Sequence, residues 1–169
     1  MKSQIAILSA AALATAILSA PLALAANTKA DAFMRKAIAG NLAEIKVGQL
    51  AQQKGASEGV RHFGAVLEQD HSTANSQAMS AAASMGMTPP AQPSPKEQAE
   101  YQRLAALSGR QFDKAFVKAM VKDHKKDIAE YKKEAKGSDS PAASYAETSL
   151  PTLQRHLRLA ESLERHPSG

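Results

Sequence analysis

The sequence of 169 residues contains no cysteine and no tryptophan, and only 4% of its residues are aromatic. Because it has no cysteine, disulfide bonds cannot stabilise the fold, and packing of side chains has to do so. After residue 25 there is no apolar run of the ~18 residues that a membrane-spanning helix needs. The chain also lacks a glycine-rich loop for phosphate groups, and nothing in it supports a nucleophilic triad.

The first 25 residues have the features of a secretory signal peptide. Lys2 precedes a long apolar run, and the run ends in the triplet Ala23-Leu24-Ala25, whose small outer residues are typical of a cleavage site. We expect cleavage after Ala25, so that residues 26–169 form one mature domain without a transmembrane span. We expect this domain in the periplasm, either free or attached peripherally to the outer membrane.

The mature chain is mildly basic. Without Lys2 it keeps 20 of the 21 lysines and arginines against 16 acidic residues, a net charge of +4. This charge permits contact with anionic surfaces of the cell envelope but does not demand it. Nucleic acid is not an expected partner of an exported protein.

Glycine and proline divide the mature chain into segments with helical periodicity, which predicts an all-α domain without strands. The expected helices cover residues 31–53, 57–85, 95–107, 109–136 and 141–165. Ser94, Pro95 and Glu97 have the spacing of a capping box, and Ser108 with Gln111 has a similar pattern. Pro151 lies inside the last segment, so a kink or break is expected near Ser149.

The lengths of the connections predict the topology. Short loops near residues 54–56 and 137–140 favour antiparallel neighbours. A proline-rich connector at 87–95, followed by the short helix, is long enough to cross the whole bundle. We therefore predict a ferritin-like four-helix bundle with a short extra helix in the long crossover between the second and third long helices.

Each long helix carries one polar residue on its apolar face, near the middle of its length. These residues are Glu44, His71, His124 and His156. Because the midpoints of aligned helices meet at one level, we expect the four side chains to converge in the core. An unpaired carboxylate in a dry core is costly, so the four groups must either bond to one another or share a cation.

Three imidazoles and a carboxylate suit zinc, iron(II), copper(II) or manganese. The sequence leaves two interpretations open: one transition-metal ion, or a polar cluster without metal in which Glu44 pairs with the histidines and fixes the helix register. The Glu-x-x-His pair of di-iron bundles is absent, so a ferritin-type two-iron centre is not expected. No substrate pocket is evident, and a metal-dependent oxidoreductase is a minor alternative; on balance the sequence does not indicate an enzyme.

The third long helix has a lysine-rich outer side, which suggests a different function as an interaction module for anionic envelope components. Its lysines are Lys114, Lys118, Lys122, Lys125, Lys126, Lys132, Lys133 and Lys136. Acidic residues are interleaved with them, so a solvated face with local ion pairs is the alternative interpretation.

Three long stretches resemble the bacterial domain-of-unknown-function family 4142, and together they reach from about Phe33 to Leu163. They read FMRKAIAGNLAEIKVGQLAQQKGASEGVRHFGAVLEQDHSTAN, SGRQFDKAFVKAMVKDHKKDIAEYKKEA and LPTLQRHLRLA. The positions that fit the family pattern are Glu44, Asp70, His71, Gly109, Phe112, Asp113, Asp123, His124, Leu150, Pro151 and His156. The resemblance implies a ferritin-like helical fold and a place in the cell envelope. It implies no reaction, since the family has no assigned biochemistry. Our leading hypothesis is a binding or stress-related accessory protein with a site in the middle of the bundle.

Overall fold

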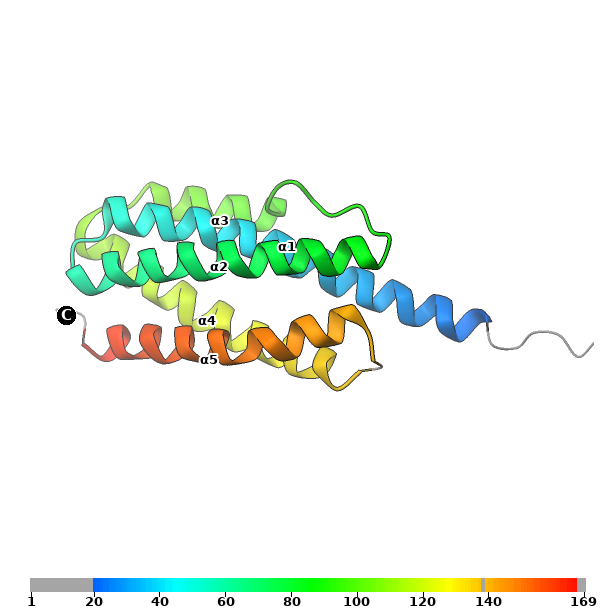
Figure 1. Cartoon of the computed structure of the whole chain (residues 1–169). Helices are drawn as coiled ribbons and strands as arrows, with labels where there is room; N and C mark the ends of the chain where they lie inside the picture. Colours follow the sequence, from blue (N-terminus) through cyan, green and yellow to red (C-terminus); the bar gives the residue numbers. More distant parts are fainter. Residues whose placement is uncertain (1–19, 138, 167–169) are drawn as a thin grey trace, which may run out of the picture.

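The computed structural model of the protein describes residues 20–137 and 139–166, with side chains from Lys29 onward. All regular secondary structure in this part of the chain is α-helical, as the hydrophobic periodicity predicts. Its helices are α1 (Ala20–Lys54), α2 (Glu58–Ser84), α3 (Pro95–Ala105), α4 (Gly109–Ala135) and α5 (Pro141–Arg165) (Figure 1). None of the described helices is both long and apolar enough to cross a membrane.

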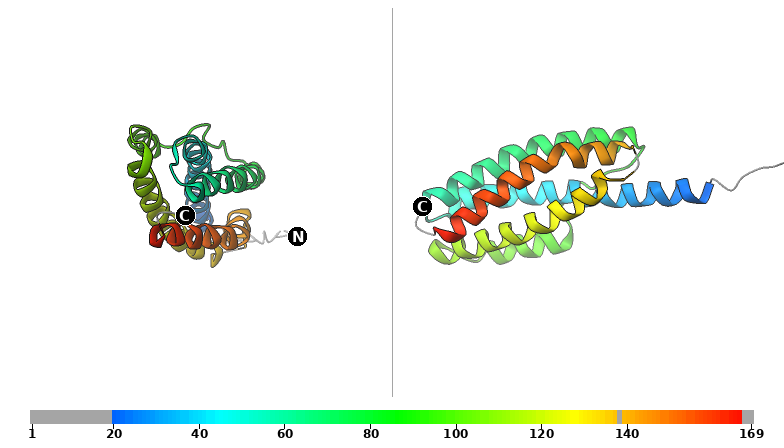
Figure 2. Two further views of the ribbon diagram at one scale, coloured as in Figure 1. Left: turned by 90° about the vertical axis from the view of Figure 1, so that its left-hand side faces the viewer. Right: turned by 90° about the horizontal axis from the view of Figure 1, so that it is seen from below.

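The four long helices form two antiparallel pairs, α1 with α2 and α4 with α5 (Figures 1 and 2). Between the pairs, the chain returns along the bundle through the proline-rich connector and α3, so that α4 runs in the same direction as α2. The short helix α3 packs against α1 and α4. The prediction of a helical bundle is confirmed, and this course of the chain agrees with a crossover connection.

Serine caps begin three helices as expected, and at the start of α5 the Ser140 hydroxyl accepts a 3.1 Å hydrogen bond from the Ala143 backbone. The Ser57 hydroxyl accepts a hydrogen bond from the Val60 backbone at the start of α2, and the capping box of Ser94 and Glu97 is formed at the start of α3. The expected cap at Ser108 is wrong, because its side chain makes no capping hydrogen bond. The next residue, Gly109, has φ of +58°, so the backbone is in the left-handed region at the first residue of α4.

Two further helix predictions need correction. The first helix begins at Ala20 instead of Asp31, because alanine and leucine favour helix and no glycine interrupts the stretch. The expected break near Ser149 is absent, since α5 continues through Pro151. The carbonyl that loses its donor belongs to Glu147, and because both residues are exposed, water can replace that donor. The Ser149 hydroxyl donates a 2.8 Å hydrogen bond to the Tyr145 carbonyl on the buried side.

A polar layer divides the hydrophobic core into two clusters. One cluster is built around Phe63, Phe112 and Phe116, and the other around Phe33 and Met34 together with two buried tyrosines. The buried residues between the two clusters along α2, α4 and α5 include the three histidines of the predicted site. The polar residues therefore lie at one level, halfway along the bundle.

A close contact between two glycines sets the position of α1 against α2. A Cβ atom on Gly48 would lie 2.6 Å from the Gly64 carbonyl oxygen, and a Cβ atom on Gly64 would lie 2.6 Å from that of Gly48. The two backbones can approach this closely only without side chains. The contact fixes how α1 is rotated and shifted relative to His71 on α2.

Candidate metal centre

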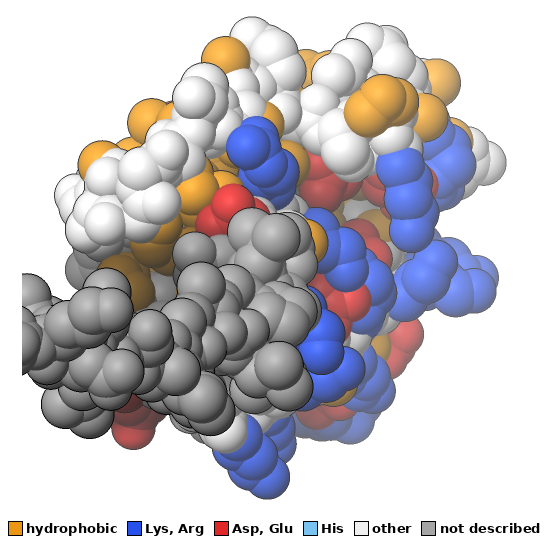
Figure 3. All heavy atoms as spheres, turned by 90° about the vertical axis from the view of Figure 1, so that its right-hand side faces the viewer, with side chains coloured by type: hydrophobic (Ala, Val, Ile, Leu, Met, Phe, Trp, Pro, Cys, Tyr) orange, Lys and Arg blue, Asp and Glu red, His pale blue; other side chains and the backbone are white. Residues whose placement is uncertain are grey.

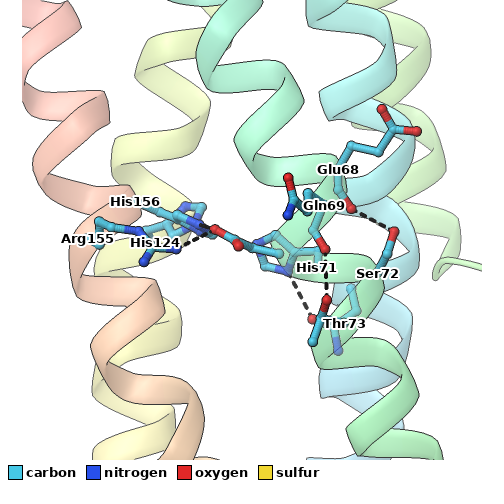
Figure 4. Close-up of polar contacts among 10 residues, drawn as sticks. Glu68, Gln69, His71, Ser72, Thr73, His124, Arg155 and His156 are labelled. Atoms are coloured by element: carbon cyan, nitrogen blue, oxygen red, sulfur yellow. Dashed lines mark hydrogen bonds and ion pairs between the residues drawn. The ribbon is translucent and has the colours of Figure 1, made fainter.

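Three histidines from three helices meet in the polar layer (Figure 4). His71 on α2, His124 on α4 and His156 on α5 are buried, with exposed fractions of 5%, 1% and 0%. One nitrogen of each ring lies within 4.8 Å of the corresponding nitrogens of the other two. The structure thus brings together three of the four residues that the sequence predicts.

In each of the three rings, one nitrogen is hydrogen-bonded to an oxygen atom. We call it the outer nitrogen, and we call the other nitrogen of the ring the inner nitrogen. The pairs are His71 Nδ1 with Asn41 Oδ1 at 2.9 Å, His124 Nδ1 with the Met120 carbonyl at 3.0 Å, and His156 Nε2 with Asp70 Oδ2 at 2.7 Å. Carbonyl and carboxylate oxygens only accept hydrogen bonds, so each outer nitrogen must be the one that carries the proton. This pattern fixes the tautomer of all three rings.

The inner nitrogens of the neutral rings are then unprotonated. His71 Nε2 is buried and has no hydrogen-bond partner among the described residues. His124 Nε2 and His156 Nδ1 lie 3.2 Å apart, and neither has a proton to offer the other. Two lone pairs at this distance repel unless a positive charge lies between or beside them.

Burial of the rings disfavours an additional proton as the source of this positive charge. Burial lowers the pKa of His71 well below its ordinary value, with further contributions from His124 and His156. Burial also lowers the pKa of His124, to about 3. The pKa of His156 is lowered by burial as well, although its hydrogen bond with Asp70 acts in the opposite direction. The three rings are therefore neutral near pH 7.

Two further contacts orient Asn41 and Asp70, the side chains that accept hydrogen bonds from His71 and His156. Asn41 Nδ2 donates a 2.9 Å hydrogen bond to the Tyr145 hydroxyl, which turns the amide oxygen of Asn41 towards His71. Asp70 accepts a 2.5 Å hydrogen bond from Arg155 in addition to that from His156. Asp70 adjoins His71 in the sequence and is a family-pattern position, but neither it nor Asn41 was predicted as a site residue.

Glu44, the fourth predicted site residue, does not join the three histidines. It is buried, at 9% exposure, but the charged groups that act on it are Asp127 and Asp123 of α4 and Glu97 of α3. Burial, followed by these three carboxylates, raises the pKa of Glu44 well above its ordinary value. The rotation of α1 places Asn41, one turn earlier, beside His71 instead. The Oε2 atom of Glu44 has no hydrogen-bond partner among the described residues.

A cavity of about 200 Å³ adjoins His71. Asp70 and His71 form part of its wall, together with Asn41 and Tyr145 and residues of the neighbouring turns of α2 and α5. Exposed residues such as Gln77 and Thr148 also line it, so the cavity reaches the surface between these two helices. The cavity depends on how side chains from four helices pack, so it could not be predicted from the sequence.

The lysine-rich side of α4 faces solvent, and all eight of its lysines are exposed. Lys125 pairs with Glu161 at 3.0 Å, and Lys126 lies 3.8 Å from both Asp127 and Glu130. Basic and acidic side chains also alternate over one side of the bundle end in Figure 3. The interpretation as a solvated face with local ion pairs agrees with these contacts.

Comparison with known proteins identifies one family. The sequence model described as Domain of unknown function (DUF4142) matches residues 16–163. No curated protein and no solved structure matches the chain.

Proposed function

The chain belongs to the DUF4142 family, and from the geometry of its polar layer we propose that it binds one transition-metal ion through His71, His124 and His156. The observation that carries the proposal is that one nitrogen from each of the three buried rings lies within 4.8 Å of those of the other two, while the outer nitrogen of each ring is paired with an oxygen atom. A cation at their centre would remove the repulsion between the lone pairs and provide the partner that His71 Nε2 lacks.

The distance between two of the rings supports this proposal. Two nitrogens bound to one tetrahedral ion at about 2.0–2.1 Å are about 3.3–3.4 Å apart. His124 Nε2 and His156 Nδ1 are separated by 3.2 Å, so a small shift of either ring is enough to accommodate an ion. A hydrogen bond between them would require a fourth proton on rings whose pKa values are lowered.

The groups that accept hydrogen bonds from the outer nitrogens are of the kind found around metal centres. Metal-bound histidines usually donate their other N–H to a carboxylate or carbonyl oxygen, which orients the ring and makes it a better ligand. Asp70, the Met120 carbonyl and Asn41 supply these acceptors. Imidazole ligands suit zinc, copper, iron and nickel better than calcium or magnesium, and among these we favour zinc, iron(II) or copper(II).

The cellular role follows as a broader proposal. The signal-peptide pattern of residues 1–25 supports export to the periplasm, where the domain would act as a binding or stress-related accessory protein. Sequencing the N-terminus of the protein isolated from the periplasmic fraction tests this. We expect the chain to begin at Ala26; recovery of the intact N-terminus from the cytoplasm would contradict export.

Metal binding is tested by loading the metal-free protein with zinc, cobalt(II), copper(II) or iron(II) under anaerobic conditions and measuring metal per chain. We expect one ion per chain in the wild type and none in the His71→Ala/His124→Ala double variant. The matched control is His62→Ala, because His62 lies on α2 but is exposed. A stoichiometry that is the same in the double variant and the wild type would contradict the proposal.

A second function is favoured by one feature only, the exposed lysines of α4. In this alternative the helix contacts anionic lipids or lipopolysaccharide, and the polar layer is purely structural. Binding to anionic vesicles should then weaken with salt. It should also fall when Lys118, Lys122 and Lys125 are changed to glutamate; binding that survives this change would exclude the mechanism.

A further inference from the structure

Among the residues that the structure describes, three side chains are grouped to bind the proposed ion and no fourth joins them. α1 is the helix that could contribute another, but the Asn41 oxygen is occupied by the N–H of His71, and Glu44 lies among the acidic residues near α3 and α4. Zinc centres with three protein ligands keep a position for water or another exchangeable ligand, whereas structural zinc centres usually have four. The polar layer therefore has the ligand set of an open metal centre.

The cavity beside His71 provides room for an exchangeable ligand. Its volume of about 200 Å³ is small, but it exceeds the ~30 Å³ that one water molecule takes up in the liquid. Half of the residues in its wall carry a hydroxyl group: Thr73, Tyr131, Tyr145, Thr148, Ser149 and Thr152. It is continuous with the surface between α2 and α5, so a small molecule could reach His71 without unfolding of the bundle.

Charge favours an anion in this position. Three neutral imidazoles leave the two positive charges of a divalent ion uncompensated. Asp70 is the only charged residue in the cavity wall, and it is already paired with Arg155 and His156. Oxyanions and other small anions bind more strongly in such a water-poor site than in bulk water, because the local dielectric constant is lower.

Tyr145 provides a hydrogen-bond donor for the anion. Its hydroxyl oxygen accepts from Asn41 Nδ2 at 2.9 Å. A hydrogen bond with Tyr145 raises the pKa of Tyr131, so Tyr131 is the donor of that bond and the proton of Tyr145 is left for a molecule in the cavity. The Asn41 contact also links this hydroxyl to the His71 ring. Tyr145 is thus placed both to orient one metal ligand and to bond to a molecule in the cavity.

We propose that the cavity between α2 and α5 holds a small exchangeable anion, bound to the metal at the position that the protein leaves open and hydrogen-bonded by Tyr145. This inference rests on the proposed function, since it requires the ion. It goes further because it describes an open centre, which exchanges ligands with the solution as reactive centres do. A structural centre would be closed.

The test uses the full mature chain loaded with cobalt(II), whose visible absorption changes when its ligands change, and azide as the small monoanion. We expect a saturable azide-dependent change in the spectrum at one cobalt per chain. Tyr145→Phe should keep the cobalt and weaken azide binding about tenfold, the effect of losing one hydrogen bond to a charged group. Tyr101→Phe is the matched control, because Tyr101 lies on α3, outside the cavity.

A second pair of variants tests whether azide reaches the metal through the cavity. Ala74 lines the cavity, so Ala74→Phe should obstruct it and weaken or slow azide binding without loss of cobalt. Ala65→Phe, at an exposed position of α2 away from the cavity, should behave as the wild type. Circular dichroism verifies that all variants keep their helical content.

The outcomes separate the two proposals. Cobalt bound at one per chain with no response to azide would overturn this inference and leave the metal site standing. An azide response that is the same in Tyr145→Phe and Ala74→Phe as in the wild type would also overturn it. If no cobalt binds to the folded wild-type protein, the proposed function and this inference both fail.

Discussion

The inner nitrogens of His124 and His156 lie 3.2 Å apart between the two hydrophobic clusters of the core. The Met120 carbonyl and the Asp70 carboxylate hold the outer nitrogens of these rings, so neither ring has a proton for the contact. A bundle stabilised by packing alone would gain more from apolar residues at these positions. The arrangement is consistent with a centre that is completed by a cation.

Metal should stabilise the folded protein. A ligand that binds only the folded state adds about 2.7 kcal/mol to the free energy of unfolding when its free concentration is 100 times Kd. We expect the unfolding temperature of the metal-free protein, measured by circular dichroism, to rise when zinc is added and to fall again with a chelator. The His71→Ala/His124→Ala variant should show no rise, whereas an equal rise in that variant would place the metal elsewhere.

Asp70 should matter for metal affinity although it is not a ligand. Its carboxylate accepts the N–H of His156, and loss of such a partner typically weakens metal binding about 10- to 100-fold. We expect Asp70→Asn to reduce zinc affinity in this range, measured by competition with a coloured chelator, while one ion per chain still binds at saturation. Asp139→Asn, an exposed position before α5, is the control. An affinity unchanged by Asp70→Asn would contradict the role given to this hydrogen bond.

The buried acid Glu44 should make the protein less stable as the pH rises. Its pKa is raised in the folded state, and that of Asp127 is raised to about 6, so the folded chain holds protons that the unfolded chain has released. These groups lower the free energy of unfolding as the pH rises above their ordinary pKa values of 4.5 and 3.8. The three histidines, with lowered pKa values, act in the opposite direction, so the comparison must be made between variants.

We therefore expect Glu44→Gln to increase the free energy of unfolding at pH 7 by roughly 1–3 kcal/mol, the cost of a buried group without a partner. Below about pH 4 the difference should disappear, because the carboxyl is then protonated in both states. Urea unfolding of the metal-free protein at a series of pH values measures the effect. Glu147→Gln, at an exposed position of α5, should change little. A Glu44→Gln variant that is less stable than the wild type at pH 7 would contradict this account of Glu44.

The contact between Gly48 and Gly64 predicts that alanine destabilises the protein at position 64, whereas alanine at position 40, outside the contact, stabilises it. Alanine at position 64 would place its Cβ atom 2.6 Å from the Gly48 oxygen and 2.8 Å from Ala51 Cβ. We expect Gly64→Ala to lower the free energy of unfolding by roughly 1–3 kcal/mol, because the backbones must separate. Gly40→Ala meets only Glu97 Oε1, at 4.0 Å, and should stabilise the helix by up to about 1 kcal/mol. Chemical unfolding of both variants tests this difference.

Local signals account for most of what the sequence predicts correctly about the fold. Serine caps, prolines and glycines mark the beginning of α2 and α3 and the ends of α2 and α4 within a residue or two, because they act on the neighbouring backbone. Pro21 stands in the first turn of α1, but it lies inside the predicted signal peptide, so the sequence of the mature chain predicts a later start. The continuity of α5 at Pro151 depends on exposure of the affected carbonyl, which the sequence does not reveal.

The candidate site, too, could be predicted only in part from the sequence. The three histidines could be brought together from periodicity and from their position along each helix, because these depend on helix length alone. Whether Asn41 or Glu44 faces His71 depends on the rotation of α1, which the Gly48 and Gly64 contact sets. Periodicity assigns both residues to broadly the same face, so it could not distinguish them. The cavity beside Tyr145 depends on packing between helices and was not foreseeable.

X-ray absorption spectroscopy of the zinc-loaded protein tests the metal centre most directly, because it reports the atoms bound to the ion. We predict three imidazole nitrogens at about 2.0–2.1 Å with one further light-atom ligand. In the His124→Ala/His156→Ala variant, this signature should be lost. A zinc ion surrounded only by oxygen, or an identical spectrum in that variant, would contradict the account.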